Sequence, residues 1–130
     1  MKKSILVISA GGPAGISCIK ALRKRDDFRI IAADKSQYAA GLQYADISIV
    51  IPPVANDGFI KSIEDIIGRY EIDVLMPSFE TGMKKLSPLM ERFDLDNQSS
   101  VMCQDKLAFS ETCKRVNLLV PDTQILREDF

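Results

Sequence analysis

A glycine-rich turn between two runs of β-branched residues constrains the fold of this 130-residue chain more than any other feature. Residues 5–8 form a continuous apolar run, which predicts a strand buried on both faces. The turn at residues 11–15 follows, and apolar residues then recur at helical spacing over residues 16–22. Residues 28–33 predict a second buried strand, which ends at Asp34. This order predicts a βαβ unit with two parallel strands.

The rest of the chain continues the alternation of strands and helices. Further strands are predicted at residues 47–51, 72–76 and 100–103. The intervening segments predict a short helical piece within 36–46, a helix capped by Asn56 or Asp57, a helix over 81–93 that Pro88 kinks or breaks, and a helix from Asp105 to about Val116. The pattern indicates an α/β fold, a three-layer Rossmann-like domain with a mainly parallel sheet and the strand order 3-2-1-4-5.

Composition excludes several classes of function. Seventeen basic and eighteen acidic residues give a net charge of −1, which argues against nucleic-acid and membrane-surface binding. The chain has no histidine, so the commonest general base is absent and no catalytic residue is assigned. Its three cysteines, at positions 18, 103 and 113, lack the spacing of metal ligands, so no metal site is predicted; they fit reduced cysteines in a cytoplasmic protein.

The glycine turn is the first candidate site. Gly11, Gly12 and Gly15 permit positive φ and let a ligand approach the backbone, and the helix that follows favours a phosphate or carboxylate at its N-terminus. Asp34 stands nineteen residues after Gly15, where dinucleotide folds place a ribose-binding acid. However, alanine occupies the first glycine position of the G-x-G-x-x-G pattern. A tight turn without a ligand therefore remains open beside a binding site.

Two further segments combine a capping pattern with polar groups suited to a ligand. Glu80 and Thr81 follow the fourth predicted strand, at the end of the sheet where α/β folds bind ligands, and both also suit the start of a helix. Asp105 and Lys106 open the last helix, and their spacing alone favours a cap followed by a solvated lysine.

Taken together, these segments resemble the N-terminal domain that precedes the ATP-grasp domain in ATP-grasp enzymes, close to carbamoyl-phosphate synthase large subunits. The resemblance is carried by Ile5–Gly15, the strand end at Asp34, Asp73–Glu80, Asp105-Lys106 with Phe109, and Val116–Thr123. These stretches occur in the family's order. The resemblance implies a pre-ATP-grasp domain over residues 1–118, with 119–130 leading into an ATP-grasp domain that lies outside this chain.

The resemblance also implies a function. Enzymes of this family use ATP and Mg²⁺ to activate a carboxylate as an acyl phosphate, which an amine or thiol then attacks. Lys106 corresponds to a nucleotide contact, and Gly11, Gly12, Gly15, Asp34, Glu80 and Thr81 are the expected substrate contacts. The expected partners are the chain's own ATP-grasp domain and a small carboxylate or amine. No cofactor is expected to bind tightly to these 130 residues alone, which should be inactive and could associate as a homodimer.

Two other classes remain as alternatives. A NAD(P)-binding module of an epimerase or reductase would use the same glycine turn for pyrophosphate and Asp34 for the ribose. It lacks the first glycine, and no tyrosine is followed four positions on by lysine. A receiver-like regulatory domain would need an exposed aspartate after the third strand, where Pro52 and Pro53 stand instead.

Overall fold

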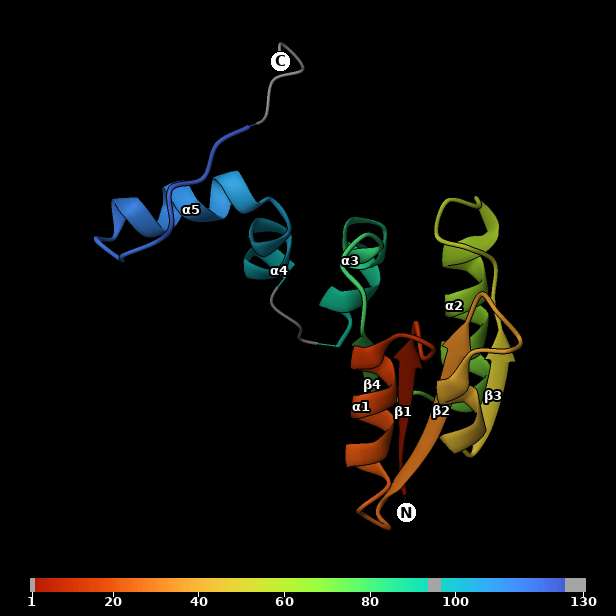
Figure 1. Ribbon diagram of the computed structural model, residues 1–130. Coiled ribbons are helices and arrows are strands. Elements are labelled where there is room, and N and C mark those ends of the chain that lie inside the picture. The colour runs from red at the N-terminus through yellow and green to blue at the C-terminus, as the bar shows by residue number, and fades with distance from the viewer. Residues whose placement is uncertain (1, 94–96, 126–130) are drawn as a thin grey trace. The chain divides into compact units, whose positions relative to one another are not determined.

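The computed structural model describes residues 2–93 and 97–125 (Figure 1). The chain divides into two compact units, Met1–Leu95 and Asp96–Phe130, and each is described by itself. The predicted domain boundary at residue 118 stays a prediction.

The first unit is built on a parallel sheet of four strands: β1 (Lys3–Ile8), β2 (Phe28–Asp34), β3 (Ile47–Val50) and β4 (Val74–Pro77). Their order is β3-β2-β1-β4, and every neighbouring pair is parallel. In register, Leu6 of β1 lies opposite Ile31 of β2 and Leu75 of β4. The α/β class and the order predicted for the first four strands are therefore confirmed.

Helices cover both faces of this sheet because successive side chains of a strand point to opposite faces. Leu6 and Ile8 join a buried cluster with α2 (Gly58–Tyr70) and α3 (Met83–Glu91). Ile5 and Val7 join a second cluster with α1 (Pro13–Leu22) and the 3₁₀ helix η1 (Ala40–Tyr44). The result is the predicted arrangement of three layers, and η1 is the short helical piece expected within residues 36–46.

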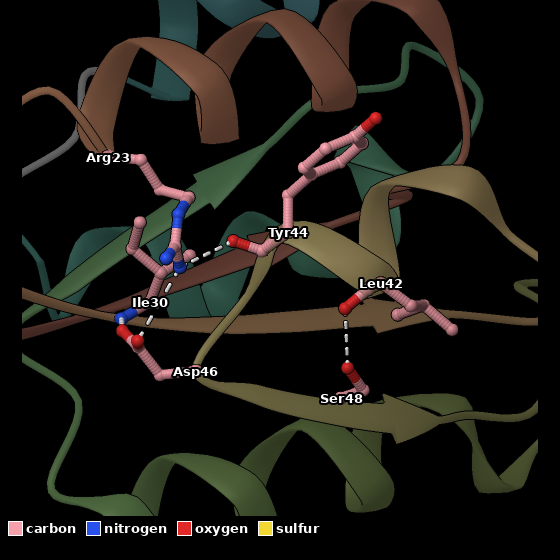
Figure 2. A network of polar contacts seen from close by, with 6 residues as sticks. All are labelled: Arg23, Ile30, Leu42, Tyr44, Asp46 and Ser48. Carbon is pink, nitrogen blue, oxygen red and sulfur yellow. Dashed lines mark hydrogen bonds and ion pairs between the residues drawn. The ribbon is translucent and has the colours of Figure 1, made fainter.

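Polar contacts fix η1 between α1 and the sheet (Figure 2). The Arg23 guanidinium, just after α1, donates to the Tyr44 carbonyl at 2.9 Å and lies 3.6 Å from the Asp46 carboxylate. Asp46 in turn accepts a hydrogen bond from the Ile30 N–H of β2 at 2.7 Å. The end of η1 is thereby joined to both neighbouring elements. This contact holds the connection between β2 and β3 against the sheet.

Local chemistry explains where the helices of this unit begin and end. Pro13 occupies the first turn of α1, where a backbone N–H would have no acceptor within the helix, so proline costs no hydrogen bond there. Of the two residues predicted to cap α2, Asn56 makes the side-chain bond, accepting the Gly58 N–H at 2.8 Å. α3 begins two residues later and ends two residues earlier than predicted. It continues through Pro88, and Leu86, Leu89 and Met90 anchor it in the core, so no break occurs there; the kink predicted as the alternative stays a prediction.

The second unit holds α4 (Asn97–Gln104) and α5 (Lys106–Arg115). The prediction of a strand over residues 100–103, with Cys103 at its end, is wrong because α4 spans this segment. An apolar run of three residues does not distinguish the period of a strand from that of a helix. α5 begins as predicted, with Asp105 accepting the N–H groups of Leu107 and Ala108 at 3.0 Å each. Within the described residues, no fifth strand follows β4.

Candidate functional site

A cleft of about 570 Å³ opens at the carboxyl ends of the strands in the first unit. This is the edge to which the arrowheads of the parallel strands point in Figure 1 and where open α/β sheets bind ligands. The volume lies within the range of small-molecule sites. The polar side is lined by Ser9, Gly11, Gly12, Asp34, Lys35, Ser36 and Thr81. The apolar side is lined by Ile51, Pro52, Pro53, Val54, Ala55, Phe59 and Phe79, and Ile8 and Ala39 complete the lining.

Two of the three glycines of the turn are needed for close packing. None of the described glycines has a positive φ, so the conformational freedom expected of them is not used. A Cβ on Gly15 would lie 2.5 Å from the Ser9 carbonyl oxygen and 2.8 Å from the Ala10 Cα. A Cβ on Gly11 would lie 2.8 Å from the Ala39 Cβ, whereas Gly12 has only the Ser9 oxygen nearby, at 3.8 Å. Gly15 therefore lets neighbouring backbone approach, Gly11 lets Ala39 approach, and Gly12 has room for a side chain.

The left-handed residue of this turn is Ser9, with φ 65°. Its carbonyl accepts hydrogen bonds from the Gly12 N–H at 3.3 Å and from the Ser78 hydroxyl at 3.0 Å. The Ser78 hydroxyl also lies 2.7 Å from the Ile8 carbonyl, so the residue after β4 braces the end of β1. Sequence reasoning missed Ser9, because serine carries no strong preference for positive φ that would have marked it.

Asp34 connects the ends of β1 and β2. One carboxylate oxygen accepts the Gly11 N–H at 2.8 Å and the other accepts the Ser36 N–H at 3.0 Å. The residue is 7% exposed and lines the cleft. Hydrogen bonds to an ionised carboxylate are stronger than those between neutral groups, so Asp34 fixes the position of the glycine turn. Its predicted contact with a ligand stays a prediction.

Residues that the sequence did not single out form the apolar side. The rings of Phe59 and Phe79 pack edge to face, with centroids 6.4 Å apart and planes at 86°. Gly82 makes room for Phe79, since a Cβ there would overlap its ring. The Lys85 ammonium donates to the Val54 carbonyl at 2.8 Å and ties the loop after β3 to α3. In the sequence, the two prolines after β3 served as evidence against a receiver-like domain.

The other predicted site residues are placed as follows. Thr81 lines the cleft, but Gly15 and Glu80 do not. Gly15 is buried under the turn and Glu80 is exposed. Lys106 belongs to the second unit, where its ammonium donates to the Cys103 carbonyl at 3.0 Å. Its predicted contact with a nucleotide stays a prediction.

Among the described residues, no group of three or more histidine, cysteine, aspartate or glutamate side chains is arranged to hold a metal ion. No helix among the described residues is long and apolar enough to span a membrane.

The fold matches part of solved synthetases, among them the following two. One is N5-carboxyaminoimidazole synthetase from Staphylococcus aureus, solved with ADP, with a TM-score of 0.70 and 20% identity over 90% of this chain and 31% of that chain. The other is an N5-carboxyaminoimidazole ribonucleotide synthetase, also solved with ADP, with a TM-score of 0.72 and 21% identity over 91% of this chain and 30% of that chain. This chain thus spans under a third of either enzyme. No curated protein gave a match.

These likenesses show the fold, a Rossmann-like domain of the pre-ATP-grasp type. Residues 5–103 match the family described as PylC-like, N-terminal domain, and the chain belongs to that family. The pre-ATP-grasp interpretation of the sequence is confirmed, and the alternative of a NAD(P)-binding module is not favoured. The closer likeness to carbamoyl-phosphate synthase stays a prediction.

Proposed function

We propose that this chain is the substrate-side domain of an ATP-dependent ligase that joins a carboxylate to an amine or thiol through an acyl phosphate, as in carbamoyl-phosphate synthase. The observation that carries the proposal is the cleft at the strand ends, whose lining combines polar and apolar residues. The chain's family, PylC-like N-terminal domain, adds support.

The two sides of the cleft suit two needs of such a reaction. The polar side offers the Asp34 carboxylate and the Thr81 hydroxyl, which can accept or donate hydrogen bonds and orient a small substrate. The apolar side, built from Pro52, Pro53 and Phe79, covers part of the bound substrate. Exclusion of water matters here because an acyl phosphate hydrolyses when water reaches it.

ATP, with its Mg²⁺, would bind outside the cleft, because the N–H groups of Gly11 and Gly12, the turn glycines in the lining, are already donated within the protein. Lys106 is the residue we assign to a phosphate of the nucleotide, as a compact cation on a flexible stem. The 130 residues alone should therefore neither hydrolyse ATP nor bind it tightly.

Hydroxylamine trapping tests the proposal on the product of the complete reading frame. In the expected reaction, a carboxylate oxygen attacks the γ-phosphorus of ATP and ADP leaves. Hydroxylamine then attacks the acyl carbon, phosphate leaves and a stable hydroxamate forms. A panel of amino acids and hydroxy acids should include one that yields a hydroxamate only with ATP. Bicarbonate is tested separately by measuring the release of phosphate, because its mixed anhydride with phosphate is short-lived.

The controls distinguish ligase activity from the alternative of a dinucleotide-binding module. The 130-residue chain without the rest of the reading frame should yield no hydroxamate. A reading frame that ends at residue 130, or saturable binding of NADH at micromolar concentrations, would contradict the proposal. The second of these outcomes would instead favour a dinucleotide-binding module.

A further inference from the structure

The glycine turn offers the cleft no free N–H group of the kind that an anion-binding turn requires, since Gly11 and Gly12 are its only residues in the lining. The Gly11 N–H is donated to Asp34 at 2.8 Å, and the Gly12 N–H to the Ser9 carbonyl at 3.3 Å. Pro13, the next residue, has no N–H. Three consecutive positions therefore offer no backbone donor to a phosphate or carboxylate.

Charge at the turn points the same way. The Asp34 carboxylate is 7% exposed and lies against the Gly11 amide. A phosphate or carboxylate that reached the same amide would come close to this like charge, in a partly buried place where solvent screens the repulsion poorly. The turn therefore suits a neutral or cationic part of a ligand.

The cation of the cleft is its neighbour, Lys35. Within residues 2–93 and 97–125, no carboxylate lies within ion-pair distance of the Lys35 ammonium, so its charge is free for a ligand. Ser36 stands beside it in the lining, and its oxygen accepts the Tyr38 N–H at 3.2 Å, which leaves the hydroxyl hydrogen available as a donor. Lys35 and Ser36 thus present two donors to the cleft, where Gly11, Gly12 and Pro13 present none.

From these contacts we propose that the cleft binds an organic oxyanion, a carboxylate or phosphate with an apolar body, and that its anionic group binds Lys35 and Ser36. The apolar body lies against Pro52, Pro53 and Val54. This inference rests on the proposed function, because it names the class of ligand that the cleft takes. It makes Lys35 a specificity-determining residue and Asp34 a positioning residue of the turn.

The test is a titration of the ¹⁵N-labelled chain, followed through its backbone amide signals. Phenylacetate and phenyl phosphate serve as anions with an apolar body, 2-phenylethanol as the neutral analogue and inorganic phosphate as the bare anion. At least one aromatic anion should bind saturably and shift the signals of Lys35, Ser36 and Val54 more than those of Gly11 and Gly12. The stronger of the two distinguishes a carboxylate from a phosphate ligand, and the neutral analogue should bind at least about tenfold more weakly.

Two lysine variants make the test specific. Lys35→Gln should weaken binding of the aromatic anion about tenfold or more, and Lys35→Arg should largely retain it. Lys24→Gln is the matched control, because Lys24 is also exposed in the first unit but lies outside the cleft, and it changes the net charge equally. Binding should be unchanged in this variant.

Several results would overturn the inference: equal losses in the two glutamine variants, inorganic phosphate shifting the Gly11 and Gly12 signals, or no saturable binding of either aromatic anion at millimolar concentration. Its failure is distinguishable from failure of the proposed function. Hydroxamate formation that is insensitive to Lys35→Gln refutes only the role of Lys35. Binding at Lys35 without any hydroxamate refutes only the ligase.

Discussion

Substituting Gly15 by alanine tests the packing of the glycine turn against the end of β1. The added Cβ would lie 2.5 Å from the Ser9 carbonyl oxygen, whereas ordinary contacts begin at 3.4 Å, and a second contact with the Ala10 Cα lies at 2.8 Å. Both neighbours are backbone atoms, so no side-chain rotation relieves the overlap. Overpacking of this kind costs up to about 3 kcal/mol. Alanine recovers about 1 kcal/mol as the better helix former, which leaves an expected net loss of about 2 kcal/mol.

Gly12→Ala is the control in the same turn. Gly12 has φ −77° and ψ 162°, which alanine adopts without strain, and its nearest neighbour would be 3.8 Å from the new Cβ. The expected loss is below about 1 kcal/mol, because alanine is only a poorer residue than glycine at the N-cap.

Urea unfolding and thermal unfolding, both followed by far-ultraviolet circular dichroism, measure the stability of the two variants. A loss of about 2 kcal/mol should lower the unfolding temperature of a unit of this size by roughly 8–16 °C. The urea dependence should keep its slope, since the surface exposed on unfolding does not change. If Gly15→Ala is no less stable than Gly12→Ala, the close approach of backbone is not the reason for glycine at position 15.

Two other substitutions test separate features of the first unit. Asp34→Asn leaves one oxygen to accept the N–H group of either Gly11 or Ser36 and sets an amide NH₂ against the remaining N–H group. The free energy of unfolding should therefore fall by about 1.5–3 kcal/mol. An unchanged free energy in urea unfolding would show that the carboxylate does not fix the turn. Gly68→Ala places a methyl group on an exposed position of α2 with no heavy atom within 4 Å, and should stabilise the chain by about 1 kcal/mol. A loss of stability there would mean that α2 packs differently at this position.

Strands were predictable from the sequence where burial on both faces leaves a continuous run of β-branched residues. β1 and β2 lie where such runs predict them, and the order of the four strands is the one predicted, which is common in doubly-wound sheets. The strand predicted at residues 100–103 was wrong because the apolar run there is too short to show a period, and α4 occupies that segment. The correct and the wrong strand predictions differ in the length of the apolar run, since a few apolar residues are compatible with either a strand or a helix.

The sequence predicted where the site lies better than it predicted which residues form it. The glycine turn and Asp34 mark the correct edge of the sheet, but their contact spans 23 residues and no local pattern shows that the carboxylate binds the turn itself. Phe59 and Phe79 come from different elements, and only the packing of α2 beside the loop after β4 brings their rings together. Lys35 has no sequence signal beyond its place after the second strand.

The bracing of β1 by Ser78 has a practical consequence. The cleft collects residues from the segments that follow all four strands, from Ile8 to Thr81, so it exists only after the sheet is complete. Any compound that binds there binds the native state alone and shifts the folding equilibrium by mass action. A melting-temperature screen of metabolite collections can therefore find the natural ligand before its chemistry is known.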